Sequence, residues 1–223
     1  MILSKKKRYL QIALNSTLDD ASSIIEQLPQ SDRIILEVGT PLIKQYGMEA
    51  VRNIFNWFNN EGVDAVPYIV ADLKTMDRAE TEVKMVKQAG ASAAICLGQA
   101  PVETIQKFIE SCKANQIDSM VDMMNVEYPI TILRKLKKQP DVVILHKGVD
   151  EETFNKDKPI PYVQINKVLS SFNVLISIAG GDTIREVQRA IFNGANIAVV
   201  WKEFYHLTGS TGQLATEFLK EIK

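Results

Sequence analysis

The sequence predicts a closed (β/α)₈ barrel, a TIM barrel, formed by a single domain over residues 1–223. Short runs rich in Val, Ile, Leu and Ala alternate with longer segments of helical period, which is typical of repeated βα units. Eight such units can be counted, and they leave little room for a second domain. An open doubly wound sheet is the less favoured alternative, because no G-x-G-x-x-G turn follows the first strand.

The eight predicted strands are apolar runs bounded by polar or turn-forming residues. In chain order they are Tyr9–Leu14, Arg33–Val38, Val66–Asp72, Ser92–Leu97, Ser119–Met123, Asp141–His146, Asn173–Ile178 and Asn196–Trp201. The predicted helices between and after them are Leu18–Leu28, Gly47–Asn60, Arg78–Gln88, Val102–Asn115, Pro129–Lys138, Val163–Ser171, Thr183–Asn193 and Gln213–Ile222. Helix-start chemistry supports several of these positions, since Thr17 precedes Asp19 and Asp20 and Thr183 precedes Glu186.

The composition is that of an ordinary globular chain, for which a small molecule is the expected partner. Hydrophobic residues make up 46% and charged residues 24%, which excludes a disordered or collagenous chain. Lys and Arg together number 26 against 27 for Asp and Glu, so the formal charge of −1 does not favour nucleic acid or an anionic membrane as a partner. Cys96 and Cys112 show no C-x-x-C spacing and are expected to be core residues rather than zinc ligands or a disulfide.

Residues 1–8 are predicted to be a short basic leader, exposed to solvent, ahead of the first strand. They include Lys5-Lys6-Lys7-Arg8 but not the apolar run of a signal peptide. No later segment reaches the roughly 18 apolar residues that a membrane-spanning helix needs. A cytoplasmic protein with no membrane partner is therefore expected.

Polar residues end most of the predicted strands, where a (β/α)₈ enzyme carries its chemistry. In chain order they are Asn15, Glu37, Asp72 with Lys74, Asp122, His146 and Gly180-Gly181. Strand alternation places Asp72 and Lys74 on one face. An ammonium between carboxylates can stabilise an anion that develops on a substrate, and a free carboxylate can bind a divalent metal. A purely structural ion pair is the alternative reading of this cluster.

Six strings of the sequence carry a resemblance to a known family. They are Leu10–Leu14, Glu37–Lys44, Ala71–Asp77, Val121–Val126, His146–Glu151 and Ala179–Gly181. In this order they resemble the orotidine 5′-monophosphate decarboxylase suprafamily of (β/α)₈ barrels. Within it they are more similar to 3-hexulose-6-phosphate synthase than to 3-keto-L-gulonate-6-phosphate decarboxylase. The D-x-K-x-x-D motif marks the suprafamily, and the strings around Glu37 and Asp72 point toward the synthase.

This resemblance implies an aldol reaction that joins D-ribulose 5-phosphate to formaldehyde, or its reverse, through an enediolate. Glu37 and Asp72 match the positions that hold Mg²⁺, a hard cation suited to carboxylates. Lys74 matches the lysine that would stabilise the enediolate charge. Asp77 matches an acid that reaches across a dimer interface, which implies a homodimer with shared active sites.

The remaining matches concern proton transfer and binding of the sugar phosphate. Asp122 and His146 match residues that touch the substrate and assist proton transfer, a role that suits the near-neutral pKa of histidine; a buried structural ring is the alternative for His146. The residues expected to bind the sugar phosphate are Asn15, Thr40, Gly180, Gly181 and Lys202. His206, by contrast, is expected at the surface.

Three positions depart from the family pattern. Asn15 stands where an Asp is usual, Asp182 places an acid near the expected phosphate, and Trp201 fills the position of a glycine at the end of the last strand. Lys202 could act as a phosphate counter-ion, though as a point charge rather than a bidentate fork. Two alternatives therefore stay open: a 3-keto-L-gulonate-6-phosphate decarboxylase-like enzyme, and a catalytically silent family member with an altered phosphate site.

Overall fold

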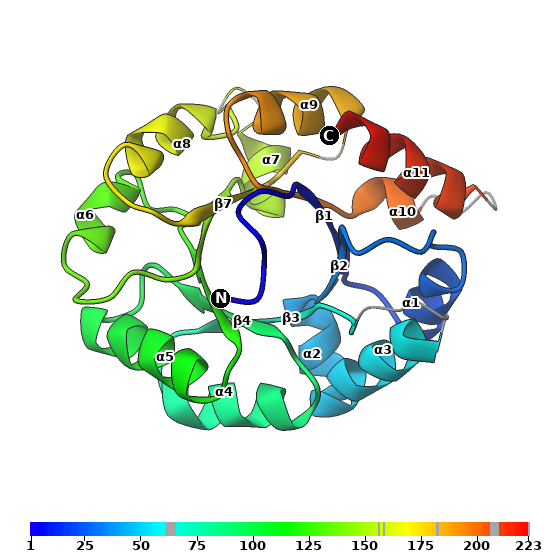
Figure 1. Ribbon diagram of the computed structural model, residues 1–223, viewed down its shortest axis with the longest axis horizontal. Coiled ribbons are helices and arrows are strands. Elements are labelled where there is room, and N and C mark those ends of the chain that lie inside the picture. The colour runs from blue at the N-terminus through cyan, green and yellow to red at the C-terminus, as the bar shows by residue number, and fades with distance from the viewer. Residues whose placement is uncertain (61–65, 156, 158, 182, 206–209, 223) are drawn as a thin grey trace.

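The computed structural model describes residues 1–60, 66–155, 157, 159–181, 183–205 and 210–222. Eight parallel strands follow one another around a closed barrel, and a ring of helices surrounds them (Figure 1). The strands are β1 (Tyr9–Leu14), β2 (Ile34–Val38), β3 (Ile69–Thr75), β4 (Ala93–Leu97), β5 (Asp118–Asp122), β6 (Val142–His146), β7 (Leu175–Ala179) and β8 (Ile197–Val200). The prediction of a single-domain (β/α)₈ barrel is confirmed.

The helices cover the outside of the barrel. They are α1 (Leu18–Ile25), α2 (Thr40–Tyr46), α3 (Met48–Asn60), α4 (Ala79–Gln88), α5 (Val102–Ala114), α6 (Pro129–Leu133), α7 (Val149–Phe154), α8 (Tyr162–Leu169), α9 (Ile184–Phe192), α10 (Lys202–Tyr205) and α11 (Thr211–Glu221). Sequence analysis missed α2, α7 and α10. Each of these has only four to seven residues, too few for a hydrophobic period to show.

Two predicted helix starts are confirmed in detail. Thr17 accepts a hydrogen bond from the backbone of Asp20 and forms a capping box with it, and Thr183 does the same with Glu186. The predicted helix from Pro129 is shorter than expected and ends at Leu133.

Two apolar layers follow from the alternation of side chains along each strand. On β1, Leu10, Ile12 and Leu14 pack outward against the helices, whereas Tyr9 and Ala13 belong to the barrel interior. The same period of two brings the last interior position of several strands to the carboxyl-terminal rim. The barrel thus directs the polar residues that end its strands toward one opening.

The amino-terminal segment lies across the barrel opening in Figure 1. Lys5, Lys6 and Lys7 are exposed, as expected for a basic leader, but Leu3 is buried inside the barrel. The backbone N–H groups of Ile2 and Leu3 donate to the carboxylate of Asp118 at the start of β5. This segment therefore packs as part of the barrel.

Strand β3 differs from its predicted bounds in a way that matters for the site. It runs to Thr75 rather than ending at Asp72, and its pairing with β4 shifts register between Ala71 and Thr75. Lys74 lies in this irregular stretch with a φ of 47°. A left-handed lysine is strained, and such strain persists where the surrounding fold imposes it.

Both cysteines are buried and free. Burial raises the pKa of the Cys96 thiol to about 12, so it behaves as a small apolar residue. Among the described residues, none of the helices combines the length and apolarity needed to span a membrane.

Candidate active site

A cavity of about 740 Å³ opens at the carboxyl-terminal ends of the strands. Its walls combine polar strand-end residues with apolar side chains from the barrel interior. The polar residues predicted from sequence that line it are Asn15, Glu37, Thr40, Asp72, Lys74, Asp122 and His146. The volume lies within the range usual for small-molecule sites.

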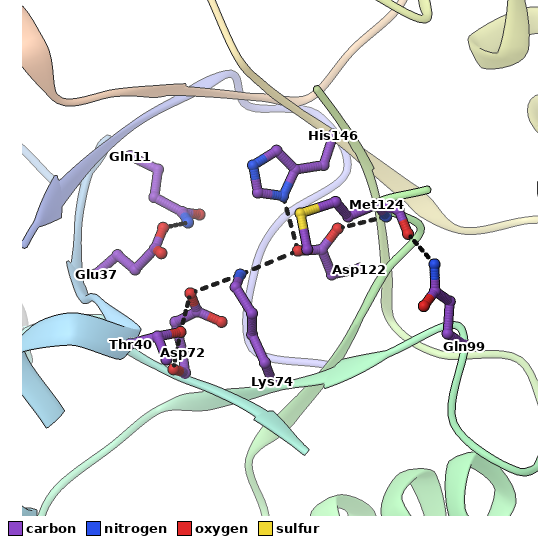
Figure 2. A network of polar contacts seen from close by, with 9 residues as sticks. All are labelled: Gln11, Glu37, Thr40, Asp72, Lys74, Gln99, Asp122, Met124 and His146. Atoms are coloured by element: carbon purple, nitrogen blue, oxygen red, sulfur yellow. Dashed lines mark hydrogen bonds and ion pairs between the residues drawn. The ribbon is translucent and has the colours of Figure 1, made fainter. Parts of the chain in front are cut away.

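Lys74 lies at the centre of this group (Figure 2). Its Nζ is 2.9 Å from Asp72 Oδ2 and 3.3 Å from Asp122 Oδ2. Burial alone would lower the pKa of Lys74, but the charges of Asp72 and Asp122 outweigh it and raise that pKa above its usual value. Lys74 is therefore a cation fixed in position, although its side chain keeps contact with the cavity.

Asp122 joins Lys74 to His146. Its Oδ2 lies 2.8 Å from His146 Nδ1, and its Oδ1 accepts from the backbone N–H of Met124 at 2.9 Å. Burial would raise the pKa of Asp122, but the charge and hydrogen bond of His146, together with Lys74, lower it. An ionised carboxylate only accepts, so Nδ1 of His146 carries the proton and Nε2 is left for chemistry.

The pKa of His146 is itself shifted. Burial lowers it, but the charge of Asp122 and the hydrogen bond to it have the larger combined effect, and the net shift is upward. His146 is thus held in orientation and made a stronger base than a free imidazole, as a general base requires.

Glu37 and Asp72 form a second acidic group on the opposite side of Lys74 from His146 (Figure 2). Gln11 Nε2 donates to Glu37 Oε2 at 2.5 Å, and Thr40 Oγ1 lies 2.8 Å from Asp72 Oδ2. Burial, with the charge of Asp72, raises the pKa of Glu37 to about 7. Two neighbouring buried carboxylates that repel each other call for a compensating cation.

These carboxylates fit a magnesium ion. Asp72 Oδ1 is buried and has no hydrogen-bond partner among the described residues, so it is free to act as a ligand. Within the described part of the chain, no three His, Cys, Asp or Glu side chains gather closely enough to hold a metal by themselves. Mg²⁺ characteristically takes one or two carboxylates and completes its shell with water and substrate oxygens.

Gly180 lines the cavity with a φ of 105°, a conformation that favours glycine. A Cβ there would lie 2.4 Å from the carbonyl oxygen of Lys147, so only glycine allows β6 and β7 to approach this closely. Gly181 is buried directly behind it, and a Cβ there would lie 2.8 Å from Ile160. Both glycines therefore lie at the corner between β6 and β7.

Lys202 is not brought into the cavity wall. Its Nζ lies 2.6 Å from Glu152 Oε2 on α7 and 5.6 Å from the centre of the Trp201 ring. Trp201 does line the cavity, and its ring packs edge-on against Tyr205 at 6.2 Å. The Tyr205 hydroxyl accepts from the backbone N–H of Asn15 at 2.6 Å. These contacts connect β1, α10 and α7 along one side of the opening.

Asp77 lies apart from this cavity in its own chain. It is exposed and borders a separate shallow hollow together with Arg78, Glu80 and Lys107. Asp182 and His206 lie outside the described residues.

The polar residues of the cavity that sequence analysis did not name as site residues are Gln11, Asn125, Lys147, Asp150, Glu151 and Glu152. Gln11 lies on β1 and faces the interior of the barrel. A polar residue within an apolar strand was the sequence signal that could have identified it. Lys147 follows His146 directly and is only 6% exposed. A lysine just after a strand usually reaches solvent, so only the folded structure shows its burial.

The fold and the site together define a (β/α)₈-barrel protein with an acid–lysine–acid cluster at the end of its third strand. The chain belongs to the Orotidine 5'-phosphate decarboxylase / HUMPS family, whose sequence model matches residues 8–200. The family resemblance seen in the sequence is thereby confirmed.

Two curated relatives show which members of the family this chain resembles. The chain is 35% identical over 219 residues to a bifunctional enzyme Fae/Hps of Methanocella arvoryzae, covering 96% of this chain and 53% of that protein. It is 40% identical over 184 residues to the bifunctional enzyme Fae/Hps of Methanocaldococcus jannaschii, covering 82% of this chain and 44% of that protein. The chain thus spans about half the length of the curated relatives it matches.

Solved structures of the same fold include a 3-hexulose-6-phosphate synthase and a related decarboxylase. The crystal structure of 3-hexulose-6-phosphate synthase from Salmonella typhimurium matches with a TM-score of 0.84 and 25% identity, covering 96% of this chain and 98% of that one. A 3-keto-L-gulonate-6-phosphate decarboxylase (KGPDC) from Streptococcus mutans matches with a TM-score of 0.81, but at 18% identity this likeness shows the fold alone.

Proposed function

We propose that this chain catalyses a Mg²⁺-dependent aldol condensation of D-ribulose 5-phosphate with formaldehyde to a hexulose 6-phosphate, or the reverse cleavage. The observation that carries the proposal is the position of Lys74, between Asp72 and Asp122, with His146 bound to Asp122. Such a group holds a cation and a base side by side in one cavity. The similarity to Fae/Hps enzymes and to a 3-hexulose-6-phosphate synthase supports the same reaction.

In this reaction His146 Nε2 removes the proton from C1 of the ketose, and the electron pair of the C–H bond becomes the enediolate. Asp122 keeps the ring in place and stabilises the imidazolium that forms. Lys74 donates hydrogen bonds to the enediolate oxygens, whose charge is larger than that of the ketone. C1 then forms a bond to the carbon of formaldehyde, and the imidazolium returns its proton to the formaldehyde oxygen.

Glu37 and Asp72 would hold the magnesium ion. When bound, Mg²⁺ supplies positive charge to the two adjacent oxygens of the enediolate. Gln11 fixes the orientation of the Glu37 carboxylate, and Thr40 fixes that of Asp72. We further propose a homodimer in which Asp77 of one subunit completes the site of the other, which its exposed position supports.

The direct test is turnover. Purified protein is incubated with D-ribulose 5-phosphate, formaldehyde and Mg²⁺, and consumption of both substrates is followed beside a Lys74→Ala variant. We expect rapid loss of both substrates with the native chain and a rate lower by about 10²- to 10³-fold or more with the variant. Equal rates for the two proteins would refute the proposal.

A second candidate is a family member with a different ligand, either a 3-keto-L-gulonate-6-phosphate decarboxylase-like enzyme or a catalytically silent protein. Two observations favour it: Trp201 lines the cavity where a glycine was expected, and Lys202 is paired with Glu152. Release of CO₂ from 3-keto-L-gulonate 6-phosphate distinguishes the decarboxylase. Absence of turnover with either substrate set leaves the silent protein.

A further inference from the structure

Gln11 lies deep in the cavity wall. Along β1 the residues Gln11, Ala13 and Asn15 line the cavity in succession, and Asn15 directly follows the strand at its carboxyl-terminal end. Gln11 is therefore the one of the three that lies furthest inside the barrel, and it is 0% exposed. A ligand group that reaches Gln11 has to be the end that enters first.

The amide of Gln11 has one end paired and the other end unpaired. Nε2 donates to Glu37 Oε2 at 2.5 Å, which leaves Oε1 as an acceptor (Figure 2). Among the described residues Oε1 is buried and has no hydrogen-bond partner. A buried acceptor without a donor costs free energy, so it is retained where something else supplies the donor.

The surroundings of Gln11 in the described structure do not supply this donor. Gln11 pairs in register with Ile35 of β2 and Val199 of β8, and both of these side chains belong to the apolar interior of the barrel. Its hydrogen-bond partner Glu37 is a carboxylate and only accepts. The donor for Oε1 therefore has to come from what enters the cavity.

The proposed reaction brings a suitable donor close to Glu37. When the ketose loses a proton from C1, the new negative charge develops on O2, whereas O1 keeps its own proton as a hydroxyl. A neutral amide oxygen accepts a hydrogen bond from this hydroxyl without adding negative charge beside the enediolate. A further carboxylate at the position of Gln11 would repel the enediolate.

We propose that Gln11 Oε1 accepts a hydrogen bond from the C1 hydroxyl of the ketose and so selects ligands with a hydroxymethyl group beside the carbonyl. The proposal rests on the proposed function for the identity of the ketose. Gln11 then binds the substrate with one end of its amide and Glu37 with the other. This double contact fixes O1, and with it the position of C1 relative to His146. The hydroxymethyl end of the ligand lies innermost, and the rest of the ligand extends toward the rim.

The test compares the binding of two ligands to the whole chain by calorimetry, with saturating Mg²⁺ and without formaldehyde. The ligands are D-ribulose 5-phosphate and its 1-deoxy analogue, which differ only in the C1 hydroxyl. Gln11→Met keeps the length of the side chain but has no amide, and Gln11→Asn keeps the amide on a side chain that is one methylene shorter. Gln88→Met is the matched control, because Gln88 is an exposed glutamine of α4 outside the cavity.

We expect the native chain to bind D-ribulose 5-phosphate more tightly than the 1-deoxy analogue. In Gln11→Met this preference shrinks about three- to tenfold, the range for loss of one neutral hydrogen bond. Gln11→Asn loses the preference to the same extent because its amide does not reach as far, and Gln88→Met keeps it. The ratio of the two affinities is the measured quantity, because loss of the hydrogen bond to Glu37 alters the binding of both ligands.

A purely structural role for Gln11 predicts a different pattern. In that case both Gln11 variants melt at a lower temperature and bind the two ligands more weakly, while the ratio of the two affinities stays that of the native chain. A native ratio in either folded variant overturns the proposal. Equal affinity of the native chain for the two ligands overturns it as well, whatever the variants do.

The outcomes separate this proposal from the proposed function. If the native chain consumes D-ribulose 5-phosphate and formaldehyde but Gln11→Met keeps the native ratio, the role of Gln11 is overturned and the proposed function stands. If the preference depends on Gln11 but formaldehyde is not consumed, the hydroxyl site stands and the proposed function falls. If the native chain binds neither ligand, both are overturned.

Discussion

Strand β5 carries a buried aspartate at each end, and the two have different surroundings. Asp118 opens the strand and Asp122 closes it, four positions later on the same interior face. Both are almost completely buried. One contacts the amino-terminal segment, whereas the other contacts Lys74 and His146 in the cavity (Figure 2).

The partners of each aspartate explain the difference. Asp118 accepts from the backbone N–H groups of Ile2 and Leu3 and from the hydroxyl of Tyr68 at 2.8 Å, and none of these three residues lines the cavity. Burial, with the charge of Asp118, raises the pKa of Tyr68, so the hydroxyl stays a donor. Lys74 and His146, which pair with Asp122, do line the cavity. Asp118, whose donors lie outside the cavity, stabilises the fold. Asp122, whose partners line the cavity, orients the side chains that would act on a ligand.

The largest expected effect is at the carboxyl-terminal end. Lys74→Ala removes the cation between Asp72 and Asp122, and we expect kcat to fall by about 10²- to 10³-fold or more, as when a preorganised donor to a developing anion is lost. Steady-state kinetics with saturating substrate measure the change. Circular dichroism should show the native fold, and a variant that is unfolded would leave its kinetics without meaning for Lys74.

Asp118→Asn is the counterpart at the other end. It removes the charge that accepts several buried hydrogen bonds, and we expect a loss of about 3 kcal/mol of stability. For a domain of this size the midpoint of thermal unfolding falls by roughly 6–12 °C. At a temperature where the variant is folded, kcat equals that of the native chain. A large loss of kcat with unchanged melting would contradict the division between the two ends.

Much of the fold follows from the sequence because strand and helix periods are local signals. The apolar runs located all eight strands, and the Thr17 and Thr183 capping boxes located two helix starts. The short helices α7 and α10 escaped because fewer than two turns show no amphipathic period. Even so, α7 supplies Glu152, the partner of Lys202.

The site was predictable where its residues end apolar strands, as at Glu37 and His146. It was not predictable where function depends on tertiary contacts. Nothing in the sequence around Lys147 indicates that this lysine is buried, and nothing around Lys202 indicates that Glu152 pairs with it. Asp118 likewise looks like an ordinary polar residue before a strand, because its donors lie more than 100 residues away in Ile2 and Leu3.

A metal-binding experiment sharpens the comparison. Mg²⁺ at a hundred times its Kd should stabilise the native chain by about 2.7 kcal/mol, a rise of roughly 5–11 °C in the melting midpoint. Glu37→Gln keeps the shape of the side chain but removes one of the two carboxylate charges, so we expect most of this rise to disappear. Melting curves with Mg²⁺ and with a chelator measure it. Asp118→Asn should keep the full response, and an equal rise in the Glu37 variant would exclude that carboxylate as a ligand.

The smallest expected effect separates the two aspartates without touching either of them. Tyr68→Phe deletes one hydroxyl that donates to Asp118 and leaves the ring in place. We expect a loss of about 1.5 kcal/mol, the lower range for a hydrogen bond to a charged group, and a fall of roughly 3–6 °C in the melting midpoint. Because Tyr68 lies at the opposite end of the barrel interior from Lys74, kcat and KM should equal those of the native chain. A changed KM at unchanged stability would mean that the lower end also acts on the ligand, and the strand would then carry one coupled site rather than two independent carboxylates.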